Sequence, residues 1–309
     1  MNNPKVSIQI PTYNQQDFIK KTIESCLMQD YPNLEINIAD DCSTDDTYKF
    51  VQPFLQDKRV RYFSNEVNIG RVGNYNKALY VYATGDWAIN LDGDDYFTDK
   101  SFISNAIEII MSRQNERIIV YQANHDMNKL LKALPTNERI NEETLLVNGT
   151  EYFLNYYQVL NFYHCATIYK RTAAIKLNFY TYNCLFTDFN SIAKLFINNR
   201  LLLSSKKVAV WHQHEVNESA SLDEEKIKDE LAAINELADF AAVQLPGKPV
   251  EKWRIKMRGY LLSNYLNMQT TAKQKRVVLK SLIRNFKFDY VIIKQLLKAI
   301  AGSVGIKLK

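Results

Sequence analysis

Three carboxylates crowd into four residues of the sequence, at Asp92, Asp94 and Asp95, directly after an apolar run. Like charges this close repel one another, and a bound cation relieves that repulsion. Hard divalent cations prefer oxygen ligands of this kind. Aspartate and glycine are also common turn residues, so the same residues could form only a turn. The pattern alone leaves a cation site and a plain turn both open.

A second acidic pair, Asp40 and Asp41, follows the apolar run 36–39. A carboxylate at a strand end could accept hydrogen bonds from a nucleobase N–H group or a ribose hydroxyl. The alternative is helix capping, which Ser43 or Thr44 with Asp46 or Thr47 would satisfy. Capping accounts for the residues from 43 onward, but it does not explain the two aspartates before them.

These clusters must be positioned by regular elements, and the first hundred residues alternate strand-like and helix-like segments. The predicted strands and helices are, in order, 6–10 (ended by Pro11), 17–29, 35–39, 43 onward, 60–63, 72–83 and 87–91. This alternation predicts an α/β fold with a largely parallel sheet and helices on both faces. Ligands of such sheets bind at the carboxyl ends of the strands. Residues 12–14, 40–43 and 92–95 all lie there, so we expect them to form one site.

The pattern is less regular beyond residue 101. Further strands are predicted at 118–123, 166–169 and 201–210, and helices dominate from about residue 222. Residues 126–147 are polar and irregular, which is typical of a long connection that lines a substrate site. We therefore expect a catalytic domain at 1–221 and a helical, basic C-terminal region at 222–309.

Four motifs, taken together, resemble family 2 glycosyltransferases in their order and spacing. They are Val6–Asn14 (VSIQIPTYN), Ala39–Thr47 (ADDCSTDDT), Asn68–Arg71 with Asn74, and Leu91–Asp95. The resemblance covers roughly residues 5–221. It implies the GT-A fold, a Rossmann-like mixed sheet flanked by helices, here with a helical C-terminal extension. Cys42 departs from the family, which usually has glycine there, and we expect a turn to tolerate it.

The resemblance also implies roles for individual residues around a UDP-sugar donor. Pro11, Tyr13 and Asp41 are expected around the uracil, with Asp41 contacting the base, and Arg71 and Asn74 along the nucleotide. Asp92, Asp94 and Asp95 are expected to span the ribose, the sugar and a divalent cation, Mn²⁺ or Mg²⁺, on the diphosphate. Asp94 and Asp95 are the expected metal ligands of this group.

An inverting transfer needs a carboxylate that takes the proton from the acceptor hydroxyl as it attacks the anomeric carbon. The segment Phe186–Phe189 resembles a family segment that usually reads Glu-Asp or Gly-Asp before a helix, and Asp188 matches the catalytic base. Thr187 stands where the family often has glutamate. The alternative is that Asp188 only caps the helix predicted at 189–197.

Two of the four histidines lie in the segment 211–221. A His-x-His pair could be half of a zinc site, but the segment offers no obvious third or fourth ligand. In the family, a histidine followed by spaced serines closes over the diphosphate and the metal. His214, an expected metal ligand, resembles that histidine, and Ser219 and Ser221 resemble the serines. His164 resembles a residue near the acceptor side and could equally be an ordinary packed histidine.

Other nucleotide-binding classes lack their signatures in this sequence. It contains neither G-x-x-x-x-G-K-[ST] nor G-x-G-x-x-G. A sugar-phosphate nucleotidyltransferase needs a glycine-rich basic loop where residues 11–16 stand. A non-catalytic nucleotide-sugar or glycan-binding protein on the same fold remains the alternative, although so many retained acidic residues argue against it.

The resemblance leads us to expect transfer of a hexose from a UDP-sugar, with UDP-glucose the first choice. The expected acceptor is a hydroxyl of a polyprenyl-diphosphate-linked oligosaccharide or of a surface polysaccharide precursor. The length and layout also resemble the glucosyltransferases that add a branch in bacterial N-glycosylation.

Charge is divided unevenly along the chain. Residues 248–309 contain 15 Lys and Arg against two acidic residues, so this region carries +13 while the rest carries −8. A basic stripe of helical spacing runs through Lys273, Arg276, Lys280, Arg284 and Lys287, which suits an anionic membrane surface. The alternative is a solvated face of a helix packed on the catalytic domain. The acidic body argues against nucleic acid as a partner.

Three features bear on location. The sequence starts without a signal-peptide pattern, it has no run of about 18 apolar residues, and its four cysteines are scattered. We expect a cytoplasmic protein that lies peripherally at the cytoplasmic face of the inner membrane.

Overall fold

The structure is a computed structural model, and it describes residues 3–214 and 223–268. The chain forms two compact units, Met1–Asn183 with Thr187–His214 and Cys184–Phe186 with Glu215–Lys309. The expected domain boundary at 221/222 falls outside the described residues and stays a prediction.

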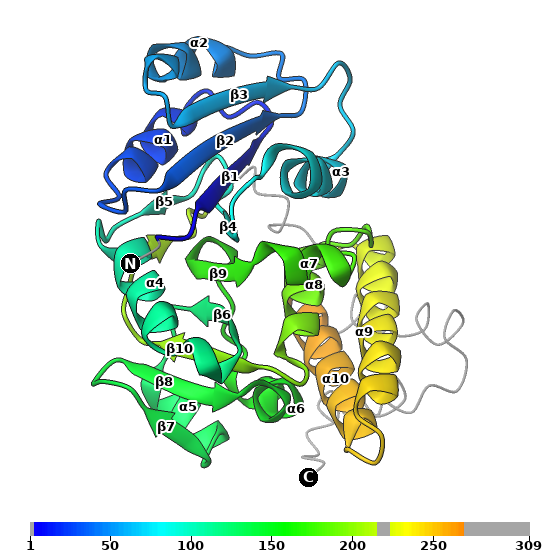
Figure 1. Ribbon diagram of the computed structural model, residues 1–309. Helices are drawn as coiled ribbons and strands as arrows, with labels where there is room; N and C mark the ends of the chain where they lie inside the picture. The colour runs from blue at the N-terminus through cyan, green and yellow to red at the C-terminus, as the bar shows by residue number, and fades with distance from the viewer. Residues whose placement is uncertain (1–2, 215–222, 269–309) are drawn as a thin grey trace. The chain divides into compact units, whose positions relative to one another are not determined.

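A mixed sheet forms the centre of the first unit (Figure 1). Its strands, in spatial order, are β3 (Val60–Ser64), β2 (Leu34–Asp40), β1 (Val6–Thr12), β4 (Trp87–Asn90), β9 (Thr167–Lys170), β6 (Ile118–Gln122), β10 (Arg200–Ser204), β8 (Thr144–Asn148) and β7 (Asn137–Arg139). The strands from β3 to β4 run parallel, whereas β9 is antiparallel to both β4 and β6. A small second sheet pairs β5 (Tyr96–Phe97) with β11 (Ala209–Val210). The expected mixed sheet is confirmed.

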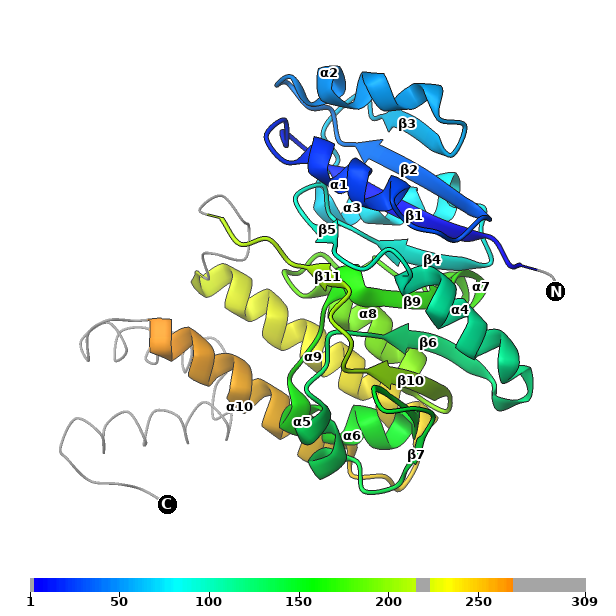
Figure 2. The same ribbon diagram turned by 90° about the vertical axis from the view of Figure 1, so that its left-hand side faces the viewer.

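Helices cover both faces of this sheet. They are α1 (Ile19–Leu27), α2 (Thr47–Val51), α3 (Arg71–Lys77), α4 (Phe102–Ser112), α5 (Met127–Ala133), α6 (Gly149–Val159), α7 (Arg171–Lys176) and α8 (Thr187–Phe196). Figures 1 and 2 show α1 and α4 on one face, and α3, α7 and α8 on the other. This two-sided cover confirms the α/β architecture expected from the alternating segments.

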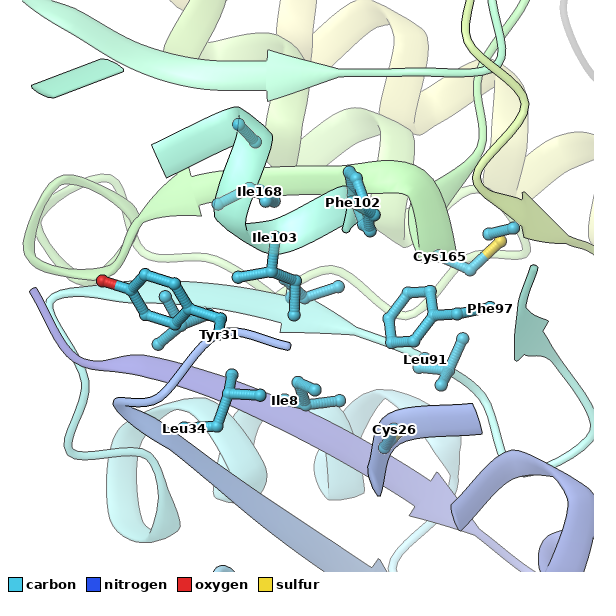
Figure 3. Close-up of a cluster of buried hydrophobic side chains, with 14 of the residues drawn as sticks. Ile8, Cys26, Tyr31, Leu34, Leu91, Phe97, Phe102, Ile103, Cys165 and Ile168 are labelled. Atoms are coloured by element: carbon cyan, nitrogen blue, oxygen red, sulfur yellow. The ribbon is translucent and has the colours of Figure 1, made fainter. Parts of the chain in front are cut away.

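The core between α1, α4 and the sheet is built from alternate strand residues. Ile8 and Ile168 point into it from two strands, and Cys26 and Ile103 reach it from the two helices (Figure 3). All of these side chains are buried. Because successive strand residues face opposite sides, the neighbouring Ser7 and Gln9 of β1 lie on the face that carries α3.

The first strand continues through Pro11, although the sequence predicted that this proline ends it. The pairing of β1 with β4 stops at Gln9, and the Pro11 carbonyl then accepts a hydrogen bond from the N–H group of Gly93. The N–H and C=O groups of one strand residue point to the same side. The donor that Pro11 lacks would therefore point past the end of β4, where no strand acceptor requires it.

Two other segments differ from their predicted structure. Residues 126–147 are not an irregular connection, because α5, β7 and most of β8 lie there, and β8 pairs with β10. The strand predicted at 201–210 is two strands in different sheets, β10 and β11. In the first case β8 is buried through its pairing with β10, more than 50 residues away, which local patterns do not reveal.

The second unit contains two packed helices, α9 (Glu224–Gln244) and α10 (Val250–Met268). An ion pair joins Arg254 of α10 to Asp239 of α9 at 2.6 Å. Helices are thus confirmed as far as residue 268, and the basic stripe at 273–287 lies outside the described residues. Within the described part of the chain, none of the helices has the length and apolar character needed to cross a bilayer.

Candidate active site

The acidic residues 92–95 form a tight turn directly after β4. The N–H group of Asp95 donates to the carbonyl of Asp92 at 2.8 Å, and Gly93 donates to Pro11 at the end of β1. A Cβ atom on Gly93 would clash with Gln15 Oε1 and lie 2.7 Å from Thr12 Oγ1. A larger residue here would therefore have to displace these side chains. The residues predicted to bind a cation thus form a turn at the carboxyl end of the sheet, with a different partner for each carboxylate.

Asp92 is held by a buried tyrosine. The Tyr75 hydroxyl lies 2.7 Å and 2.8 Å from the two carboxylate oxygens of Asp92. Burial, and then the charge of Asp94, raises the pKa of Asp92 to about 7, although the Tyr75 hydrogen bond and Arg71 act in the opposite direction. The charged form of Asp92 is therefore costly in this environment.

Asp95 points into the protein. Its side chain is 4% exposed, and its Oδ1 accepts a hydrogen bond from the N–H group of His212 at 2.9 Å. Burial, followed by the charges of Asp92 and Asp94, raises the pKa of Asp95 well above its ordinary value. The contact with His212 fixes the segment after β11 against the acidic turn.

Asp94 and His214 meet at the open side of the turn. Nε2 of His214 lies 2.8 Å from Oδ2 of Asp94. The His214 ring also stacks on Phe18, with centroids 4.5 Å apart and planes 14° from parallel. Residues separated by 120 positions are thus joined in one contact, and the ring of Phe18 sets the plane of the imidazole.

Asp188 lies in the first turn of α8 with its side chain 22% exposed. Its charge acts on Asp92 and on Tyr75, because it is among the causes that raise the pKa of each. Oδ2 of Asp188 lies 3.9 Å from Nδ1 of the buried His164. The charge of Asp188 therefore acts on the acidic turn, and its expected role as the base stays a prediction.

The side chains of Asp41 and Asn74 form hydrogen bonds with other groups of the protein. Oδ1 of Asp41 accepts from Asn65 Nδ2 at 2.8 Å and from the Ile69 N–H group at 2.9 Å. The Asn74 amide donates to the carbonyl of Ala39 at 2.7 Å. Both side chains brace the end of β2, and their expected contacts with a nucleotide stay predictions.

The remaining predicted donor-site residues surround the same edge. Pro11 is buried in β1, and Tyr13 beyond it is 47% exposed. Arg71 opens α3 and lies over the Tyr75 ring at 5.4 Å. Ser219 and Ser221 lie outside the described residues. Their roles, like those of the other predicted site residues, stay predictions.

The donor set fits a hard divalent cation that is held only partly by protein. Among residues 3–214 and 223–268, three or more acidic, histidine or cysteine side chains do not gather as a complete set of ligands. Asp94 and His214 share one contact, whereas Asp92 and Asp95 are bound by Tyr75 and by the His212 N–H group. Mg²⁺-type sites commonly use one or two protein ligands and take the rest from phosphates and water.

Sequence reasoning missed two residues that organise this site, Tyr75 and Phe18. Tyr75 is four residues after Arg71 in α3, so both lie on one helix face, and that spacing was a readable signal. Phe18 precedes α1 and reaches His214 only through tertiary folding, and local patterns carry no sign of this contact.

Comparisons with known proteins agree with this geometry. Residues 7–177 match the profile of the family described as glycosyl transferase family 2. A GalNAc(5)-diNAcBac-PP-undecaprenol beta-1,3-glucosyltransferase of Campylobacter jejuni is 38% identical over 115 residues, which is 37% of this chain and 35% of that relative. An Escherichia coli relative, UDP-Glc:alpha-D-GlcNAc-diphosphoundecaprenol beta-1,3-glucosyltransferase WfaP, is 38% identical over 124 residues, covering 40% of this chain and 47% of the relative. The chain thus matches less than half of either relative's length.

Solved structures share the fold along almost the whole chain. S. aureus TarS 1–349 in complex with UDP-GlcNAc superimposes with a TM-score of 0.62 at 17% identity, covering 99% of this chain and 93% of that one. A mannosyltransferase of Pyrobaculum calidifontis in complex with GDP-Man and Mn²⁺ gives a TM-score of 0.60 at 15% identity, with 98% and 81% coverage. At such low identity these likenesses establish the fold, which is GT-A.

Proposed function

The chain belongs to glycosyl transferase family 2 and is a glycosyltransferase of the GT-A fold, and on this basis we propose that it transfers a hexose from a UDP-sugar to a glycan hydroxyl with inversion. The observation that carries the proposal is the crowding of Asp92, Asp94 and Asp95 at the carboxyl end of the sheet. The pKa values of Asp92 and Asp95 are raised, which marks a site completed by positive charge.

We assign the cation-binding role to Asp94 and His214, with Mn²⁺ or Mg²⁺ as the cation. Asp95 remains a candidate third ligand, although its Oδ1 already accepts from His212. When bound, such a cation neutralises negative charge on a diphosphate leaving group. The protein's own part is to hold Asp94 and His214 2.8 Å apart in a fixed plane against Phe18.

Asp188 is the proposed base. Its carboxylate takes the proton from the acceptor hydroxyl while that oxygen attacks the anomeric carbon from the side opposite the leaving diphosphate. Direct attack of this kind inverts the configuration at that carbon. Arg71, whose charge acts on Asp92 together with that of Asp188, favours the ionised carboxylates at this edge.

The relatives support the proposed donor and acceptor. The Escherichia coli relative is named for UDP-Glc, and both relatives are named for undecaprenol-linked acceptors. We therefore propose UDP-glucose as the donor, and a polyprenyl-diphosphate oligosaccharide or a polysaccharide precursor as the acceptor. We propose a location at the cytoplasmic face of the inner membrane, held through the basic residues of the C-terminal region.

A panel of nucleotide-sugars with an undecaprenyl-diphosphate oligosaccharide acceptor tests this function. We expect release of UDP from one UDP-sugar in Mn²⁺ or Mg²⁺, loss of the reaction in EDTA, and an inverted product anomer by NMR spectroscopy. Asp188→Asn should lower the transfer rate by about 10³-fold or more while donor binding remains. Asp46→Asn, which removes an exposed carboxylate at the same end of the sheet, should leave the rate unchanged.

Each result contradicts a different part of the proposal. Transfer that persists in EDTA would contradict the proposed role of the cation. Full activity of Asp188→Asn would contradict the assignment of Asp188 as the base. Donor binding without transfer to any acceptor would favour a non-catalytic nucleotide-sugar or glycan-binding protein.

A further inference from the structure

Behind Asp188 lies a buried chain of polar side chains from three separate segments. His164 is 8% exposed and belongs to a short 3₁₀ turn before β9. Its Nε2 lies 2.9 Å from the hydroxyl of Tyr180, and that hydroxyl lies 3.2 Å from the hydroxyl of Tyr169 in β9. Its other ring nitrogen, Nδ1, faces Asp188 at 3.9 Å. This series of polar side chains therefore runs from the interior of the sheet to the proposed base.

Nδ1 of His164 has no hydrogen-bond partner among the described residues. A buried polar atom without a partner is unusual, since such groups are costly to desolvate. The nearest charged group is the Asp188 carboxylate. Hydrogen bonds at active sites are often long in free enzymes and shorten when substrate binds, so the 3.9 Å separation fits an interaction completed by the substrate.

The position of the single ring proton follows from the neighbours of His164. Burial lowers the pKa of His164 to about 4, with Asp188 acting in the opposite direction, so the ring is neutral at pH 7. Burial raises the pKa of Tyr180 well above its ordinary value, so its hydroxyl keeps its proton and can donate. With the ring proton on Nδ1, pointing at Asp188, Nε2 accepts from the Tyr180 hydroxyl. The other tautomer would aim a lone pair at a carboxylate, which is repulsive.

The loop that carries Tyr180 is tied to the helix that carries Asp188. The Tyr180 N–H group donates to Oγ of Ser191, one turn after Asp188 in α8, at 3.0 Å. Tyr180 itself has φ +55°, a left-handed conformation that a tyrosine adopts only when its surroundings impose it. Tyr180 thus contacts both His164 and the helix that carries Asp188, and these two contacts fix the positions of His164 and Asp188 relative to one another.

We propose that His164 is a positioning residue for Asp188, with Nδ1–H directed at the carboxylate and the tautomer set by Tyr180 and Tyr169. The proposal rests on the role of Asp188 as the base. His164 does not touch the substrate. It orients the carboxylate and favours its ionised form, and so keeps Asp188 ready to accept a proton.

Other groups around Asp188 also act on its charge. Asp188 interacts electrostatically with Tyr75 of α3, with Asp92 of the acidic turn and with Tyr180 of the loop after α7. Arg71 acts on Asp92 and on His164. Asp92 repels the charge of Asp188, and the two tyrosines are neutral. His164 is also neutral, so it acts on Asp188 through a directed N–H group. Substitutions of His164 can therefore separate its role from the effects of the charged groups.

Three substitutions at one position distinguish positioning from packing. His164→Asn places an amide N–H group near the position of Nδ1, His164→Gln places one nearer Nε2, and His164→Phe keeps the ring without either nitrogen. We expect His164→Phe to lower kcat about 10- to 100-fold, with less than about a threefold change in KM for the donor. The acidic limb of its kcat/KM profile should move to higher pH, because a carboxylate without its donor is protonated more easily.

The rescue by asparagine is the decisive measurement. His164→Asn should recover most of the rate and the wild-type pH profile, whereas His164→Gln should behave like His164→Phe. Equal rates and profiles for wild type, His164→Phe and His164→Gln would overturn the proposal, as would His164→Asn behaving like His164→Phe. Circular dichroism confirms that each variant is folded. If none of the three folds, Tyr180→Phe must show the same shift of the acidic limb in smaller measure, and an unchanged profile there also overturns it.

The proposed function and this inference fail in different ways. If Asp188→Asn retains full activity, the base assignment is wrong whatever His164 does. If Asp188→Asn is inactive and His164→Phe matches wild type, only the positioning role is wrong.

Discussion

Buried acidic residues at the two ends of the parallel strands have pKa values that are shifted in opposite directions. At the amino end of β2, Glu35 is 4% exposed and is surrounded by donors. Lys5 and Arg61 form ion pairs with it at 2.5 Å and 2.7 Å, and Ser7 and Thr84 add hydrogen bonds. Burial alone would raise the pKa of Glu35, but these donors lower it to about 2.

At the carboxyl end, the acidic turn has the reverse balance. Burial, followed by the charge of Asp94, raises the pKa of Asp92, and burial, followed by the charges of Asp92 and Asp94, raises the pKa of Asp95. The amino end compensates its buried charge with donors from the protein, whereas the carboxyl end leaves its carboxyl groups with raised pKa values. Buried charge is therefore stabilised at one end of the sheet and costly at the other.

The largest effect is expected from Asp94→Asn, which removes one negative charge from the acidic turn. We expect the transfer rate to fall by about 10³-fold, because the shared contact with His214 no longer carries the charge that a cation needs. The melting temperature in EDTA should rise by about 2 °C, since like-charge repulsion on Asp92 and Asp95 is relieved. Calorimetry and a UDP-release assay measure the two effects. A variant that is both active and less stable would show that the turn is an ordinary structural element.

The matching change at the amino end is Glu35→Gln. It leaves Lys5 and Arg61 beside a neutral amide and should lower the free energy of unfolding at pH 7 by about 2 kcal/mol. The partial exposure of the two basic side chains, 37% and 40%, screens the loss and keeps it moderate. Well below the unfolding transition, kcat should stay within about twofold of wild type. Urea denaturation measures the stability, and a large loss of kcat with unchanged stability would reverse the assignment of the two ends.

The pH dependence of stability sharpens the same contrast. The pKa of Glu35 is about 2 in the folded protein against an ordinary value of 4.5, so the unfolded chain binds the proton first as pH falls. The stabilisation by Glu35 is fully present above about pH 4.5 and is lost toward pH 2. Wild type and Glu35→Gln should therefore differ most at pH 6, and the difference should shrink below about pH 4.5 and vanish near pH 2 in urea titrations. A constant difference across this range would show that the charge of Glu35 contributes nothing.

The acidic turn could be predicted from the sequence, and the Glu35 cluster could not. Asp92–Asp95 are neighbours in sequence and follow a predicted strand, so one local pattern gave both their crowding and their place in the fold. The partners of Glu35 come from residues 5, 7, 61 and 84 and meet only when the strands pair. The same reason hid the stacking of Phe18 on His214 and the polar chain behind Asp188.

The misjudged segment 126–147 has a related cause. Leu145 of β8 is buried against the sheet through its pairing with Leu203 of β10, a contact that no local periodicity reports. By contrast, the parallel strands and α1 were predicted because each buries an apolar face that can be read within one element.

The smallest expected effect comes from substituting Cys42. This substitution tests whether backbone strain, and not charge repulsion, lowers stability at the carboxyl end of the sheet. The residue follows Asp41 with φ +66°, a left-handed conformation that favours glycine, and its Sγ lies 3.7 Å from the carbonyl of Glu66. The resemblance placed a usual glycine at this position, and the left-handed conformation seen in the structure is one that favours glycine. Cys42→Gly should stabilise the protein by about 0.5–1 kcal/mol, because relief of the strained φ exceeds the added freedom of the unfolded chain.

The matched control is Cys42→Ala, which removes the thiol but keeps a Cβ atom in the same conformation, and it should be neutral or slightly destabilising. Thermal unfolding of both variants, with the transfer rate as a check on the site, separates the two contributions. If Cys42→Gly raises the melting temperature as much as Asp94→Asn does, strain matters as much as charge repulsion at this end. If Cys42→Gly gives the small gain and Asp94→Asn the larger one, repulsion among the carboxylates destabilises this end of the sheet more than the backbone strain at Cys42 does.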